Sequence, residues 1–290
     1  MGPRALPPGL VIDPSLPPDI SVELRSAPHL LRMARMGRRI ERTHSPTMPF
    51  AVFGFMVVVS IAAGAPALMA LSVAVALIMA AKWAASDATN RAARRRLRLA
   101  YENAQGYVLP EDLDPPCQGL LRRAQDAVHA ILNSRVQRAG FIDTINNQVT
   151  LPEEVWQIAQ RLANLSRMHA EHNRLVPHDM PSGMEEAFKP YTSALDAAWT
   201  SLSKRVKQLE RYARQVQQAD RVFQAHQRLE ALAERTHEYQ ALVADTLRDD
   251  LATRHIKELA DQARNARKLF EESIAQARQT AGELLRNPLS

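Results

Sequence analysis

The stretch MPFAVFGFMVVVSIAAGAPALMALSVAVALIMAA, residues 48–81, decides how this chain folds. It runs for 34 residues without Asp, Glu, Lys, Arg, His, Asn or Gln. More than about 18 consecutive apolar residues are typical of a membrane-spanning helix. As one straight helix the stretch would measure about 51 Å, against a hydrocarbon core of about 30 Å. It is therefore too long for one upright span.

The centre of the stretch, at Gly64, Ala65 and Pro66, predicts a reversal. Pro66 lacks a backbone donor, and Gly64 accepts the conformations that a tight turn needs. We therefore expect a two-span transmembrane helical hairpin. Its spans cover 48–63 and 67–83 within residues 48–85. Two alternatives stay open: one long tilted helix kinked at Pro66, and a hairpin that enters a single leaflet.

Arginine clusters flank the stretch on both sides. They are Arg32, Arg35, Arg38, Arg39 and Arg42 before it, and Arg91, Arg94, Arg95, Arg96 and Arg98 after it. Cytoplasmic flanks of membrane spans collect Lys and Arg, which favours a hairpin with both termini in the cytoplasm. The excess of Arg over Lys is typical of a GC-rich bacterial genome, so we expect the inner (plasma) membrane of a bacterium. Nucleic acid is a weaker candidate partner, because no zinc-finger or aromatic RNA-binding motif accompanies the arginines.

Two elements are predicted before the hairpin. Residues 1–25 are rich in proline, and we expect an extended or flexible arm. Residues 26–47 fit a basic amphipathic helix whose apolar stripe includes Leu30, Met33 and Ala34. This stripe lies either in the membrane interface, with the arginines on anionic head groups, or against the protein's own helices.

Further helices are predicted after the hairpin. The second span continues as a basic juxtamembrane helix over 86–108. Residues 109–183 form a region of short helices, in which the apolar spacing from Leu120 to Val136 predicts one amphipathic helix that ends near Gly140.

A second helix of this region is predicted to begin at Thr150. Thr150 can cap a helix, Pro152 suits its first turn, and two glutamates follow on the positive end of the helix dipole. Residues 141–149 are accordingly expected to be strand-like or irregular.

The last part of the chain, residues 184–290, predicts a domain of long helices. Apolar residues step by four and three through Leu195, Trp199, Leu202, Val206, Leu209, Ala213 and Val216. Such a seam occurs both inside a helical bundle of one chain and in a coiled coil between chains, and the sequence leaves both open. A reversal near 245–250 would fold the long helix into an antiparallel pair.

One constellation could suggest metal chemistry. His169, Glu171 and His172, followed by His178 and Asp179, place metal-ligand types close together. Their spacing matches neither the H-E-x-x-H nor the H-x-x-E-H pattern, so we expect solvated residues at a helix end rather than a zinc site.

Composition excludes several other classes of site. The single cysteine, Cys117, permits no internal disulfide, and we expect an inert thiol rather than a nucleophile. No two of the ten glycines lie within six residues of each other, so no phosphate-binding loop, dinucleotide fingerprint or nucleophile elbow can be written. We predict no catalytic residue, cofactor or metal.

The sequence therefore predicts an all-α protein in which a two-span hairpin precedes a cytoplasmic helical bundle or coiled-coil domain. The expected function is a non-enzymatic membrane anchor that binds a cytoplasmic protein partner or itself. The alternative is a protein that remodels or permeabilises membranes through its short hairpin and its basic interfacial helix.

Overall fold

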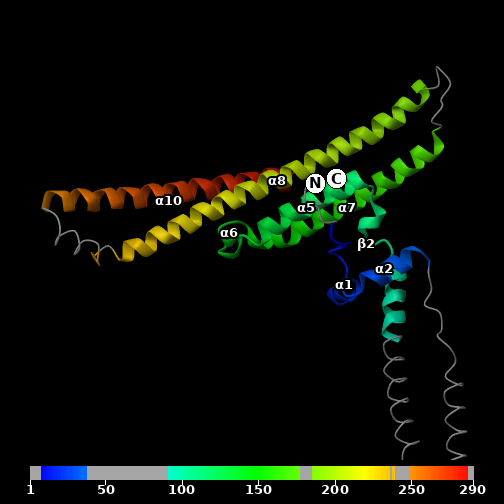
Figure 1. Cartoon of the computed structure of the whole chain (residues 1–290), viewed down its shortest axis with the longest axis horizontal. Helices are drawn as coiled ribbons and strands as arrows, with labels where there is room; N and C mark the ends of the chain where they lie inside the picture. Colours follow the sequence, from blue (N-terminus) through cyan, green and yellow to red (C-terminus); the bar gives the residue numbers. More distant parts are fainter. Residues whose placement is uncertain (1–7, 38–90, 177–184, 236, 239–248, 287–290) are drawn as a thin grey trace, which may run out of the picture. The chain divides into compact units, whose positions relative to one another are not determined.

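Helices make up most of the described structure, which confirms the all-α fold class (Figure 1). The computed structural model describes residues 8–37, 91–176, 185–235, 237–238 and 249–286. The chain divides into two compact units. The larger unit comprises Met1–Pro14 and Val108–Ser290, and the smaller unit comprises Ser15–Tyr107. Two short strands, β1 (Val11–Ile12) and β2 (Tyr107–Val108), form a two-stranded sheet.

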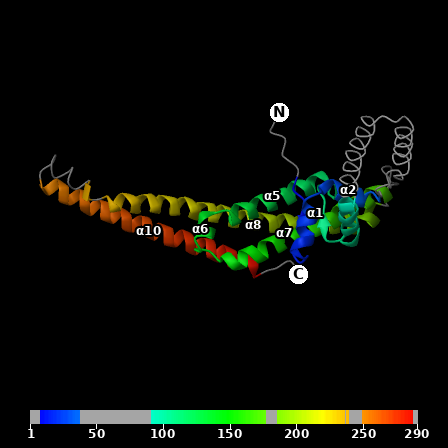
Figure 2. The ribbon, with the colours of Figure 1, turned by 90° about the horizontal axis from the view of Figure 1, so that it is seen from below.

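The larger unit is built around α8 (Glu185–Glu234), which is long enough to pack against different helices along its length. Its 50 residues correspond to about 75 Å, whereas the 18 residues of α5 (Pro115–Leu132) correspond to about 27 Å. Toward its amino end α8 packs against α5 and α7 (Thr144–Leu175). Toward its carboxyl end it packs against α10 (Asp249–Leu285), as Figures 1 and 2 show.

The predicted seam lies inside this unit. Leu195, Leu202, Val206, Leu209, Ala213 and Val216 are buried, and Trp199 is partly buried. They belong to one apolar cluster with residues of α5, α7 and α10. Since helices of the same chain cover the seam, it is the inside of an intramolecular helical bundle.

The predicted antiparallel pair is present as α8 and α10, which lie side by side over much of their length (Figure 1). Asp249 and Asp250 of the predicted reversal are already the first residues of α10. Residues 245–248 lie outside the described residues.

Polar side chains start the shorter helices of the larger unit. Asp114 accepts a hydrogen bond from the Cys117 amide at 2.9 Å and caps α5. Ser134 caps the short helix α6 (Arg135–Arg138). The amphipathic pattern that predicted one helix up to Gly140 is thus divided at Ser134, because the Ser134 hydroxyl accepts a hydrogen bond from the Gln137 amide at 3.2 Å and starts a new helix. Gly140 ends α6 with a φ of 76°.

The predicted start of α7 at Thr150 is wrong. The helix begins six residues earlier, at Thr144, because the Asp143 side chain accepts a hydrogen bond from the Asn146 amide at 3.0 Å. The Thr150 hydroxyl donates to the Asn146 carbonyl within the helix and caps nothing. Pro152 lies inside α7, where burial of the surrounding residues outweighs the loss of one backbone hydrogen bond.

The smaller unit contains α1 (Pro18–Arg25), α2 (Pro28–Arg35) and a helix over residues 91–102. Its buried apolar residues are Leu24, Ala27, Leu30, Leu31, Ala34, Leu97, Ala100 and Tyr107. Where the sequence predicted a flexible arm over 1–25, residues 18–25 instead form α1. Pro18 occupies the first turn of α1, where its missing N–H costs nothing, and burial of Leu24 holds the helix in place.

Two residues of the predicted apolar stripe are covered by protein. Leu30 and Ala34 are at most 7% exposed, as is their neighbour Leu31, whereas Met33 is partly exposed and Gly37 is exposed. The buried residues of α2 therefore pack against the chain's own residues.

No helix among the described residues is both long and apolar enough to cross a membrane. The predicted hairpin over 48–85, with its tip at Gly64, Ala65 and Pro66, lies outside the described residues, and so do Arg38, Arg39 and Arg42.

Candidate functional site

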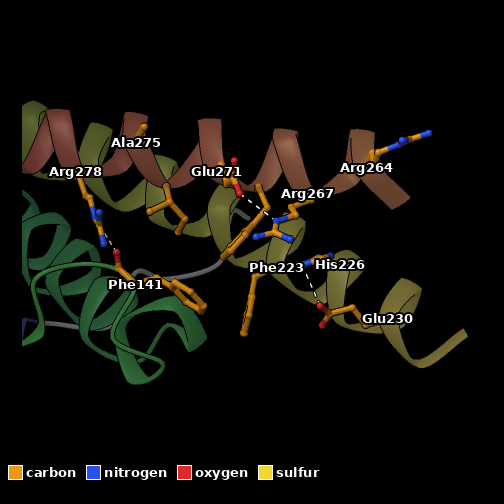
Figure 3. Close-up of a pocket in the computed structure, with 11 residues that line it drawn as sticks. Phe141, Phe223, His226, Glu230, Arg264, Arg267, Glu271, Ala275 and Arg278 are labelled. Atoms are coloured by element: carbon orange, nitrogen blue, oxygen red, sulfur yellow. Dashed lines mark hydrogen bonds and ion pairs between the residues drawn. The ribbon is translucent and has the colours of Figure 1, made fainter. Parts of the chain in front are cut away.

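The larger unit has a cavity of about 810 Å³, which we call the aromatic pocket. It lies where the segment between α6 and α7 meets the α8 and α10 pair (Figure 3). Its lining residues are Phe141, Phe223, His226, Glu230, Arg264, Arg267, Phe270, Glu271, Ile274, Ala275 and Arg278. The volume falls within the range of about 300 to 1,000 Å³ that is common for ligand sites.

Three phenylalanines form the apolar part of the pocket. The Phe141 ring meets the Phe223 and Phe270 rings edge to face, with centroids 5.2 and 5.0 Å apart. Phe223 and Phe270 stack at 5.4 Å, and the His226 ring lies 5.7 Å from Phe270. Phe270 is buried, whereas Phe141 and Phe223 keep part of their surface exposed. The cluster therefore offers ring surface to a ligand.

The chain positions Phe141 through both backbone groups of that residue. Gly140 turns the chain out of α6, and the Phe141 amide donates to the Val136 carbonyl at 3.0 Å. The Phe141 carbonyl accepts from the Arg278 Nε at 2.8 Å (Figure 3). One arginine of α10 thus fixes the segment that carries the ring.

Charged side chains surround the rings. Arg267 and Glu271 pair at 3.2 Å, and His226 lies 3.4 Å from Glu230. Arg264 pairs with Asp261 outside the pocket. Among the described residues, no carboxylate lies within ion-pair distance of Arg278.

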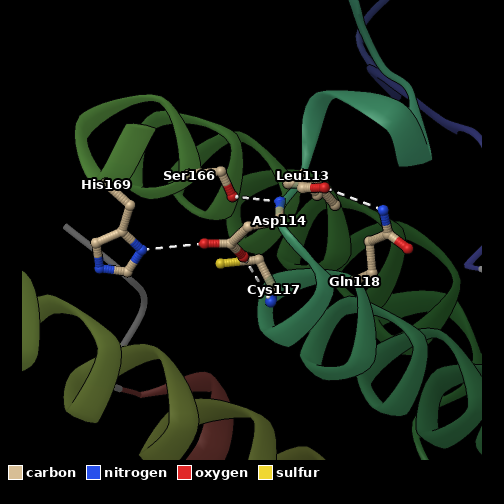
Figure 4. Close-up of polar contacts among 6 residues, drawn as sticks. All are labelled: Leu113, Asp114, Cys117, Gln118, Ser166 and His169. Atoms are coloured by element: carbon tan, nitrogen blue, oxygen red, sulfur yellow. Dashed lines mark hydrogen bonds and ion pairs between the residues drawn. The ribbon is translucent and has the colours of Figure 1, made fainter. Parts of the chain in front are cut away.

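A second cluster lies at the start of α5 (Figure 4). The His169 Nδ1 lies 3.0 Å from the Asp114 Oδ2, while the Ser166 hydroxyl accepts from the Asp114 amide at 3.0 Å. Burial would raise the pKa of Asp114, but hydrogen bonds from Cys117 and His169 outweigh it, and the pKa is lowered. Asp114 therefore stays ionised and serves as a helix cap.

Cys117 is not available as a nucleophile. Its side chain is fully buried. Burial, reinforced by Asp114, raises the pKa of the thiol to about 12. Since the thiolate is the reactive form, this cysteine is inert at neutral pH, as the sequence led us to expect.

The predicted metal-ligand types do not converge on one point in the described structure. His169 contacts Asp114, while Glu171 and His172 line a separate groove between α7 and α8. His178 and Asp179 lie outside the described residues. No group of three potential metal ligands is present among the residues that the structure describes.

That groove has a volume of about 500 Å³ and a largely apolar lining. Met168, Leu175 and Tyr191 line it and are 55%, 66% and 65% exposed. Large exposed apolar side chains in one groove mark a surface that can dock a protein segment.

The predicted basic residues that the structure describes lie in the smaller unit. Arg32 and Arg35 lie on α2, and Arg91, Arg94, Arg95, Arg96 and Arg98 lie on the helix over 91–102. Some of them have protein partners. Glu23 lies 4.0 Å from Arg95 and 3.8 Å from Arg96, and the Arg35 guanidinium lies 5.0 Å above the Tyr107 ring.

In comparisons with known proteins, no family model, no curated protein and no solved structure matches this chain.

Sequence reasoning did not identify the aromatic pocket. A signal was present, because only four of the seven phenylalanines lie outside the apolar stretch, and three of those four meet in the pocket. Their separation along the sequence hides this, since Phe141 and Phe270 are brought together only by the return of α10.

Proposed function

We propose that this protein is a non-enzymatic membrane anchor that presents a cytoplasmic helical domain to a protein partner. One observation carries the proposal. The uncharged stretch over 48–81, flanked by arginines, belongs to the same chain as a helical unit with its own buried core. Such a chain combines a segment suited to a bilayer with a domain suited to protein contacts.

The proposed topology is a two-span hairpin in the inner membrane of a bacterium, with both termini in the cytoplasm. The arginines on each side of the stretch support it through the positive-inside rule. Arginines near the spans would also contact anionic head groups, each contributing about 1 kcal/mol near the surface.

A protein partner is favoured over self-assembly through the helical seam. Six of the seven seam residues from Leu195 to Val216 are already buried by helices of the same chain, and the seventh, Trp199, is partly buried. Among the described residues, the aromatic pocket and the α7–α8 groove are two surfaces that a partner can contact. Permeabilisation through α2 has less support, because Leu30 and Leu31 are buried.

Membrane fractionation tests the anchor. We expect the full chain to stay with membranes after an alkaline carbonate wash. A variant with Val58→Arg and Val75→Arg, one arginine near the middle of each predicted span, should lose this behaviour, because each arginine costs about 2.5 to 3.5 kcal/mol there. The control is the wild-type chain with the single substitution Ala197→Arg, on the exposed surface of α8, and it should stay with the membranes like the wild type. Release of the wild-type chain by the wash would refute the anchor.

Partner binding is tested on the same membranes. The full chain, purified in mild detergent, should retain a specific protein that a chain truncated after Asn103 loses. Recovery of the same proteins with both chains would refute the assignment of partner binding to the helical domain.

A further inference from the structure

We propose that the aromatic pocket binds a short acidic segment of a partner protein through one aromatic side chain of that segment. The proposal deepens the proposed function, because it gives the anchored domain a docking site and its partner a chemistry, and it rests on that function. The observation behind it is three phenylalanine rings beside arginines in one cavity of about 810 Å³ (Figure 3).

The rings favour an aromatic side chain. Phe141 contacts Phe223 and Phe270 edge to face, and the latter two stack. Aromatic groups gain from such geometries beyond the area that they bury. Because Phe141 and Phe223 keep exposed surface, an added ring can extend the cluster.

Aromatic rings alone can bind a cation. In this pocket, however, the carboxylates that would attract a cation already have partners. Glu271 already pairs with Arg267 at 3.2 Å. Glu230 lies 3.4 Å from His226. A cationic ligand would have to displace these contacts and approach the arginines of the lining.

Arg278 favours an anion. Its Nε donates to the Phe141 carbonyl, and none of the described carboxylates pairs with it. A guanidinium has five N–H donors in a planar fork, so a ligand carboxylate can bind the remaining ones. Arg264 and Arg267 pair with Asp261 and Glu271, but the lining as a whole holds three arginines against two glutamates, which is an excess of positive charge.

The spacing of the arginines favours a peptide over a small molecule. Arg264 and Arg278 are 14 residues apart on α10, or about 21 Å along the helix. An extended segment of about six residues spans this distance, at roughly 3.4 Å per residue. A single small carboxylate reaches only one end.

The test uses a displayed library of random peptides of roughly twelve residues, which is twice the length needed to span Arg264 and Arg278. The library is selected on the full chain in mild detergent. We expect enriched peptides to carry Phe, Tyr or Trp flanked by Asp or Glu. Enrichment of basic peptides, of peptides without an aromatic residue, or of none would overturn the proposal.

Variants then locate the site of the enriched peptides. Arg278→Gln should weaken binding about threefold to fivefold, as expected for an exposed ion pair, and more at low salt. Phe223→Leu, which keeps apolar bulk but removes the ring, should weaken it about tenfold. Arg211→Gln, on the exposed surface of α8 outside the pocket, should change nothing. Thermal unfolding of each variant shows that it is folded. Unchanged binding to both pocket variants would overturn the proposal.

Failure of the pocket proposal is distinguishable from failure of the proposed function. The Arg278→Gln, Phe223→Leu double variant is compared with the wild type for retention of the membrane partner. Full retention by the double variant would overturn the pocket assignment and leave the anchor intact. Release of the wild-type chain from membranes would refute the anchor, whatever peptides the pocket binds.

Discussion

The ion pair between Glu154 of α7 and Arg205 of α8 makes the sharpest prediction about stability. The two side chains are 8% and 5% exposed, and both carboxylate oxygens accept hydrogen bonds from the guanidinium, one of them at 2.8 Å. Each charge has therefore lost most of its water and depends on the other. Removing one charge leaves the other buried without compensation.

The magnitude follows from that burial. Glu154→Gln keeps the shape of the side chain but removes its charge, and should lower the free energy of unfolding by about 3 to 5 kcal/mol. For a unit of this size, that corresponds to a fall in melting temperature of roughly 6 to 20 °C. Replacing the pair by Glu154→Leu and Arg205→Met should restore stability to within about 1 kcal/mol of the wild type, because both desolvation costs disappear.

Thermal unfolding of the full chain in mild detergent, followed by far-UV circular dichroism, measures these differences. The matched control is Glu271→Gln, which breaks an ion pair whose side chains are 65% and 73% exposed. It should cost no more than about 0.5 kcal/mol. A loss below about 1 kcal/mol for Glu154→Gln, or a double variant no more stable than the single one, would refute the reasoning.

Three further predictions concern caps and the thiol. Cys117 should resist a disulfide reagent at about pH 8 until the protein is unfolded, and prompt reaction of the native chain would contradict its burial. Asp114→Ala should cost about 1 to 2 kcal/mol near neutral pH by uncapping α5 and removing the contact with His169. Because the folded-state pKa of Asp114 is lowered from its ordinary value of 3.8, this contribution is present above that value, and the difference from the wild type should shrink as the pH falls through the lowered pKa. A difference that stays constant in acid would contradict this assignment. Asp220→Ala should speed hydrogen exchange of α6, whose Arg135 amide donates to Asp220, and leave α10 unchanged.

The sequence predicts the long helices well because their signal is periodic. The spacing from Leu195 to Val216 identifies the buried face of α8, and the absence of Gly and Pro over 191–281 favours long helices on both sides of the predicted reversal. What periodicity does not provide is the partner of that face. The structure supplies it, since α5, α7 and α10 cover the seam.

Helix boundaries are predicted less well because several residues compete as caps. Thr150 and Pro152 have the composition of a helix start, yet Asp143 caps α7 and burial carries the helix through Pro152. Ser134 likewise divides an amphipathic pattern that continues on both sides of it. The caps are local, but which candidate acts as the cap and whether the helix continues through Pro152 depend on tertiary packing, which outweighs local preference.

The candidate site depends on long-range contacts. Phe141 and Arg278 are separated by 137 positions and meet only because α10 returns along α8. Local spacing carries no trace of such a contact. In the same way, the burial of Leu30 on α2 reflects the packing of the smaller unit, whereas its sequence pattern alone also fits a membrane interface.

Labelling with a thiol reagent that does not cross the inner membrane tests the central claim most directly. Because Cys117 is buried and its thiol pKa is about 12, the reagent should label only a cysteine that is introduced into the chain. In spheroplasts, Ala65→Cys at the hairpin tip should be labelled, whereas Val22→Cys and Ala197→Cys, both at exposed positions, should be labelled only after lysis. Labelling of Val22→Cys or Ala197→Cys before lysis, or protection of Ala65→Cys, would contradict a two-span anchor with a cytoplasmic helical domain.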